Sequence, residues 1–147
     1  MTPVYDSGLC PYTNAPYTRM MHSISDDDFS ALISRALDEL PERYVSHLDN
    51  VVITYDDVPN KHQVKKMHLR GDRTLLGLYE GIPMISRGAG YNLVLPDKIT
   101  LFKLPLLSIS RDADSFYQQI KHTLWHEIAH FYGLDHDKIH EIEAHWQ

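Results

Sequence analysis

The chain has 147 residues, of which 43% are hydrophobic and 23% charged, and its formal net charge is −6 with histidine neutral. This length fits one domain around a single core. The acidic balance argues against a general nucleic-acid or membrane-surface binder. Cys10 is the one cysteine, which excludes an intramolecular disulfide. We see no signal peptide and no apolar run of the roughly 18 residues that a membrane span needs, so we expect a cytoplasmic protein.

The first residues carry three prolines and no amphipathic period, so we predict an extended, partly disordered arm over residues 1–23. A single domain is expected over residues 24–147. It opens with a helix, because Ser25 is a good N-cap and apolar residues recur after it at helical spacing up to Leu40. Pro41 closes this helix or opens a short second turn through Pro41–Leu48.

Three segments are predicted as strands. Val51–Tyr55 is rich in β-branched residues and fits a buried strand. Leu75–Glu80 is a second strand, and Ile99–Leu104 a third that Pro105 stops. The basic stretch Lys61–Arg73 is typical of a solvated loop or face.

Two helices complete the chain. The longer one, Ala113–Tyr132, begins after a cap at Asp112 or Asp114, and a last short helix runs over about Asp137–Trp146. Together these elements predict an α+β fold in which a small, mixed, three- to four-stranded sheet packs against the long helix. We choose Leu75–Glu80 as the sheet edge that borders a cleft, where an extended peptide could be added as a strand.

The long helix carries H-E-x-x-H. His126 and His130 are four residues apart, so their imidazoles lie one turn apart on one helix face and can bind a single zinc ion at about 2 Å. Glu127 is rotated from His126 by roughly 100°. That places its carboxylate beside the metal, where it can take a proton from metal-activated water. The same arithmetic puts Glu127 within an apolar stripe, where an unpaired carboxylate is costly.

A glycine and a third histidine extend the motif to H-E-x-x-H-x-x-G-x-x-H. On a continuous helix His136 would lie about 15 Å along the axis from His126 and could not share its ion. Gly133 can end the helix in the left-handed conformation and turn the chain back, which makes His136 the expected third ligand. The competing third ligands are Asp135, Asp137, His140, Glu141 and Glu143. Tyr132, His140 and His145 are considered as oxyanion donors, without a choice among them.

This stretch resembles the active helix of zincin metallopeptidases, in the extended form that metzincins use. A wider resemblance, over about Ser25 to Glu143, is to the small, minimal zincin-like metallopeptidases of bacteria. Metzincins also have a Met-turn under the metal, whereas only eleven residues follow His136 and none is Met; the minimal family lacks that turn. The blocks that carry the resemblance are Ala36-Leu37-Asp38-Glu39-Leu40-Pro41, Leu48-Asp49-Asn50-Val51-Val52, Leu75-Leu76-Gly77-Leu78-Tyr79-Glu80-Gly81, Pro96-Asp97-Lys98-Ile99-Thr100-Leu101-Phe102 and Thr123-Leu124-Trp125-His126-Glu127-Ile128-Ala129-His130.

The resemblance implies a minimal zincin-like fold and hydrolysis of peptide bonds in a peptide or protein substrate. We therefore expect a zinc metallopeptidase with Zn²⁺ on His126, His130 and His136 and with Glu127 as general base, and without nucleic-acid or membrane partners. Two alternatives stay open: a non-catalytic metal-binding or interaction module that kept the fold, and a zinc hydrolase of another amide. Substrate preference and oligomeric state are not specified by the sequence.

Overall fold

The central sheet is built from three short strands. In the computed structural model, which describes residues 4–6, 24–67, 73–92 and 94–145, these strands lie in the order β2 (Val51–Asp56), β5 (Asp97–Phe102) and β4 (Gly77–Glu80). β2 runs parallel to β5, and β4 runs antiparallel to it. A separate antiparallel pair joins β1 (Val4–Asp6) to β3 (Arg73–Leu75). The predicted α+β class with a small mixed sheet is confirmed.

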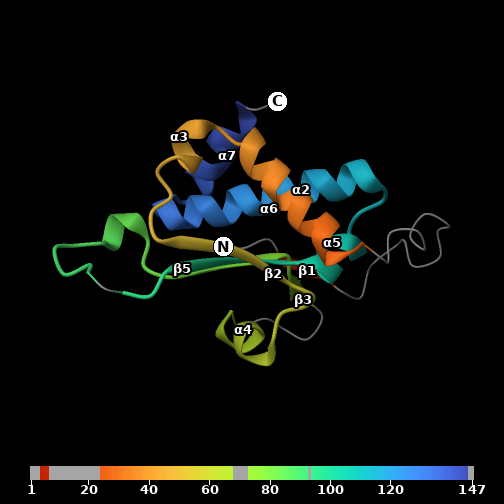
Figure 1. Cartoon of the computed structure of the whole chain (residues 1–147), viewed down its shortest axis with the longest axis horizontal. Coiled ribbons are helices and arrows are strands. Elements are labelled where there is room, and N and C mark those ends of the chain that lie inside the picture. The colour runs from red at the N-terminus through yellow and green to blue at the C-terminus, as the bar shows by residue number, and fades with distance from the viewer. Residues whose placement is uncertain (1–3, 7–23, 68–72, 93, 146–147) are drawn as a thin grey trace.

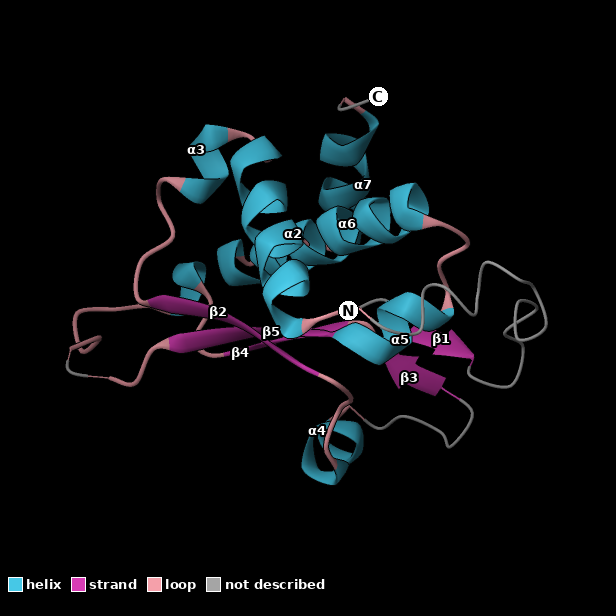
Figure 2. Cartoon of the chain, turned by 45° about the vertical axis from the view of Figure 1, so that its right-hand side comes forward, coloured by secondary structure: helices cyan, strands magenta, loops and turns pink. Residues whose placement is uncertain are grey.

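One helix lies across the sheet and is the centre of the packing. This helix, α6 (Ala113–Tyr132), contacts β4 and β5 on one side and α2 (Asp26–Glu39) on the other. Two further helices, α3 (Glu42–Val45) and α7 (His136–Ala144), lie on the same face of the sheet as α6, as Figure 1 shows. Figure 2 shows α4 (Lys61–Lys66) on the opposite face. Within the described residues, no helix has the length and apolar character of a membrane span.

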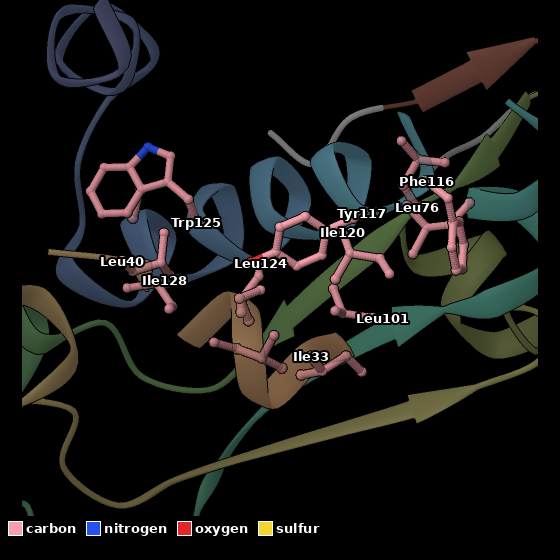
Figure 3. Packing of buried hydrophobic residues seen from close by; sticks show 14 of the residues in the cluster. Ile33, Leu40, Leu76, Leu101, Phe116, Tyr117, Ile120, Leu124, Trp125 and Ile128 are labelled. Carbon is pink, nitrogen blue, oxygen red and sulfur yellow. The ribbon is translucent and has the colours of Figure 1, made fainter. Parts of the chain in front are cut away.

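The main core fills the space between α6, α2 and the sheet (Figure 3). The members of the apolar stripe predicted for α6 are all at least 97% buried. Phe116, Ile120, Leu124 and Ile128 belong to this core, and Phe131 packs against Tyr79 of β4. Burial of such side chains contributes about 1.5–3 kcal/mol each, which is the main force that holds α6 on the sheet.

The predicted helix starts are confirmed in detail. The Ser25 hydroxyl accepts a hydrogen bond from the Asp28 backbone N–H at 3.1 Å and caps α2. Asp112, rather than Asp114, caps α6: its carboxylate accepts from the Ser115 N–H at 2.7 Å, and the Ser115 hydroxyl accepts from the Asp112 N–H at 3.0 Å. These reciprocal bonds satisfy backbone donors that have no partner inside a helix.

Three strand predictions need correction. The segment predicted as one strand over Leu75–Glu80 is divided at Leu76 between β3 and β4, which belong to different sheets. β2 is half-buried rather than buried, because it is an outer strand of its sheet. Pro105 does not stop a strand. β5 ends at Phe102, and Pro105 lies in the first turn of α5 (Lys103–Ser108), where no intrahelical N–H is required.

The structure describes only part of the basic stretch and of the two chain ends. The first part of the basic stretch forms the short helix α4, capped by Asn60, and its lysines are exposed as predicted. Residues 68–72 lie outside the described residues. The predicted arm, apart from β1, also lies outside them, as does Trp146 at the predicted end of the last helix.

Candidate metal centre

The C-terminal half of α6 buries two polar groups in an apolar setting. His126 is 6% exposed, and Glu127 is completely buried. The prediction that Glu127 falls inside the apolar stripe is therefore confirmed. Such burial is unfavourable for a carboxylate unless a positive or hydrogen-bonding partner compensates it. We therefore expect such a partner beside the Glu127 carboxylate.

Gly133 ends α6 and reverses the chain, as predicted. It has φ 76° and ψ 23°, the left-handed conformation that glycine adopts without steric cost. Its N–H donates to the carbonyl of His130 at 3.0 Å, and the Leu134 N–H donates to the carbonyl of Ala129 at 3.0 Å. A Cβ on Gly133 would also lie 2.5 Å from the side chain of Ile85, which occupies that space.

The turn brings the three histidines of the motif together. α7 starts at His136, directly after its cap Asp135. The ring centroids of His126 and His130 are 4.9 Å apart, and the ring of His136 lies 5.5 Å from the first and 6.0 Å from the second. The three imidazole rings are therefore neighbours around the turn, and imidazole is a common zinc ligand.

The environment keeps His126 neutral. Burial, followed by the nearby His130 and His136, lowers the pKa of His126 from 6.5 to about 3. Only the neutral ring has a lone pair for a metal ion. His126 is therefore in its metal-binding form throughout the physiological pH range.

Glu127 has the opposite shift. Burial raises the pKa of its carboxyl from 4.5 to about 8, and the backbone N–H of Tyr79 compensates only in part. Neither carboxylate oxygen makes a hydrogen bond of ordinary geometry to the described residues. A nearby divalent cation would favour the ionised carboxylate, because the charge of an ion dominates the local electrostatics. The donor set and this buried carboxylate therefore fit a metal ion beside Glu127.

A glycine in β4 lets the strand approach Glu127 closely. A Cβ on Gly77 would lie 2.7 Å from Thr123 Cγ2 and 3.3 Å from Glu127 Cγ. Real side chains do not reach such distances without displacing their neighbours. Gly77 thus sets α6 directly against β4, the outer strand chosen from the sequence as the edge of a cleft.

A buried ion pair that sequence reasoning missed holds the loop between β4 and β5. Arg87 is 8% exposed in its side chain, and its Nη2 lies 2.8 Å from Oδ2 of Asp97, which is 2% exposed. The hydroxyl of Tyr79 donates to the same carboxylate, and the guanidinium lies 4.9 Å from the ring centroid of Phe131 on α6. The glycine-containing loop Ser86–Gly90 is thus anchored at Arg87. The one feature of the sequence that pointed to this ion pair is Asp97, an acidic residue at the start of an apolar strand.

Several competing third ligands have other partners. The Asp135 carboxylate accepts from the Lys138 N–H at 2.8 Å, and Glu141 pairs with Lys138 Nζ at 3.0 Å. Among the oxyanion candidates, the Tyr132 hydroxyl donates to the Tyr44 carbonyl at 2.6 Å. Asp135, Glu141 and Tyr132 thus each have a partner other than the three imidazoles.

Glu143 is the competitor that comes near the motif. Its carboxylate forms a group with His122 and His126 in which one ligand atom from each residue lies within 4.8 Å of the others. The sequence prediction did not include His122, although it stands four residues before His126 and so on the same helix face.

A family comparison identifies the chain. The family model of the zincin-like metallopeptidases matches residues 48–146, more than half of the sequence. The chain belongs to this family. Membership makes it a relative of metal-dependent peptidases, which act on peptides or proteins and typically hold zinc. A comparison with curated protein sequences gives no significant match.

Proposed function

We propose that this zincin-like protein is a zinc-dependent peptidase in which His126, His130 and His136 bind the ion and Glu127 is the general base. The observation that carries the proposal is the fully buried Glu127 carboxylate, which lacks a hydrogen bond of ordinary geometry and directly follows one of three clustered histidines. A structural role does not account for it, because a buried acid without a partner destabilises a fold.

The three histidines and Glu127 have different roles in the proposed hydrolysis. His126, His130 and His136 would hold the zinc ion, which would supply Lewis-acid activation of water and of the scissile carbonyl. Glu127 accepts the proton of the attacking water and then donates it to the leaving amine.

We propose His136 as the third ligand. The turn at Gly133 brings the centroid of its ring to 5.5 Å from that of His126 and 6.0 Å from that of His130. Asp135 is used as the cap of α7 and Glu141 is paired with a lysine. Neutral imidazole binds zinc well at neutral pH.

The substrate would lie along β4. In the described part of the chain, this strand pairs with β5 on one side and has no strand on the other. An extended peptide added to that edge would gain backbone hydrogen bonds without a sequence requirement. Because Gly77 of β4 lies against Glu127, such a peptide would pass the general base.

The test is metal-dependent hydrolysis of an unstructured peptide. The purified protein should hold about one zinc per chain, since the proposed ligands make one closed set. Chelation should abolish hydrolysis, and added zinc should restore it. A folded, zinc-reconstituted chain without hydrolysis of any unstructured peptide would favour the non-catalytic alternative.

A further inference from the structure

A histidine outside the proposed zinc set extends the row on α6. His122, His126 and His130 recur every four residues, so they lie on one face of the helix. The ring centroids of His122 and His126 are 6.4 Å apart. His126 therefore pairs with His122 on one side and with His130 on the other, and the H-E-x-x-H motif uses only the pair with His130.

Helix α7 places the carboxylate of Glu143 beside His122 and His126. Ile139 and Ile142 on α7 are buried and hold it against the core, which leaves Glu143 with a side chain only 17% exposed. Glu143 Oε1 lies 3.4 Å from His122 Nδ1, and Oε2 lies 3.4 Å from His140 Nδ1. Carboxylate and imidazole are both good zinc ligands.

The contacts of Glu143 are long for hydrogen bonds and have the spacing of metal ligands. Charge-assisted N–H···O bonds are about 2.7–2.9 Å long. Two ligands of a tetrahedral zinc ion, each about 2.0–2.1 Å from it, lie about 3.3–3.4 Å apart. Glu143 Oε1 is also buried without a hydrogen-bond partner among the described residues. A cation between His122 and Glu143 would satisfy this oxygen.

We propose that His122, His126 and Glu143 form a second binding position for a divalent transition-metal ion such as zinc. The position shares His126 with the set that contains His130 and His136. A neutral imidazole has one lone pair, so His126 binds one ion at a time and the two positions exclude each other. His122 is the exposed member, with 49% of its side chain accessible, so metal can reach this position from solvent.

The experiment isolates the second position by removing the first. The full chain carrying His130→Ala and His136→Ala keeps His122, His126 and Glu143, and Co²⁺ or Zn²⁺ alone is the probe. We expect one ion per chain, measured by competition with a chromophoric chelator and by the absorption spectrum of bound Co²⁺. Adding Glu143→Gln or His122→Ala should weaken binding at least tenfold.

The control is Glu141→Gln, because Glu141 is an exposed glutamate of the same helix that pairs with Lys138. It should leave metal affinity unchanged. If the double variant does not fold, His130→Ala alone takes its place in the same measurements. If neither Glu143→Gln nor His122→Ala changes the metal affinity, the proposal is overturned. The contacts of Glu143 with His122 and His140 would then be ion pairs only. The readout is binding rather than hydrolysis, so the result does not depend on whether the chain is a peptidase.

Discussion

Replacing Glu127 with glutamine should stabilise the metal-free protein while it destroys the proposed catalytic base. The carboxyl is completely buried, and its pKa is raised from 4.5 to about 8. Ionising it in the metal-free fold is therefore more costly than in the unfolded chain. Glutamine has nearly the same shape and carries no charge, so it retains the packing and removes this cost.

The sign and size of the effect follow from the two pKa values. Because the folded pKa is above the unfolded one, the folded state binds more protons between pH 4.5 and 8, and stability falls as pH rises through that window. Between pH 4.5 and 7 the loss is about 3 kcal/mol, at about 1.4 kcal/mol per pH unit. The advantage of Glu127→Gln should thus be small at pH 5 and about 2–3 kcal/mol at pH 7.

The assay is chemical or thermal unfolding of chelated protein at pH 5 and pH 7. For a domain of this size, the expected difference at pH 7 corresponds to roughly 6–12 °C in Tm. Glu141→Gln is the matched control and should change stability little at either pH, because Glu141 is exposed. A Glu127→Gln variant that is less stable than the wild type at both pH values would refute the reasoning, since the carboxylate would then have a favourable partner.

Three further predictions concern the same region. His136→Ala should weaken zinc binding at least about tenfold, or roughly 1.4 kcal/mol. His140→Ala, the control, should have a much smaller effect. A zinc affinity that is unchanged by His136→Ala and falls on loss of Glu141 or Glu143 would contradict the ligand assignment. Gly77→Ala should destabilise the fold by about 1–3 kcal/mol in denaturant unfolding, because its Cβ would lie 2.7 Å from Thr123 Cγ2. Because the pKa of His126 is lowered from 6.5 to about 3, the contribution of His126 to metal-free stability should be lost as pH drops from 6.5 toward 3. Below pH 4.5, where Glu127 adds no pH dependence, the free energy of unfolding should therefore depend less steeply on pH in His126→Asn than in the wild type.

Local signals were enough to predict the long helix and its turn. Asp112 is a strong cap, apolar residues recur at helical spacing on both sides of Glu127, and Gly133 is the residue type that a left-handed helix end requires. Each of these depends on neighbours within a few positions in the chain. The spacing of His126, His130 and His136 around that turn then brings their rings together, although their role as ligands stays a prediction.

Long-range contacts account for what the sequence did not predict. Arg87 stands among glycines and resembles a loop residue, but Asp97, ten positions later, makes it one end of a buried ion pair. The closeness of His122 and Glu143 depends on how α7 docks, which no local pattern encodes. β2 has a composition typical of a buried strand, and only its outer place in the sheet leaves it half-exposed.

Hydrolysis of an unstructured peptide by zinc-reconstituted Glu127→Gln, set beside the wild type, tests the central claim most directly. The substitution removes the general base and leaves all three proposed histidine ligands. The account predicts that the rate falls by roughly 10² or more, the usual scale for the loss of such a base, while zinc content stays at about one ion per chain. A variant that holds its zinc and hydrolyses the peptide at the wild-type rate would contradict the account.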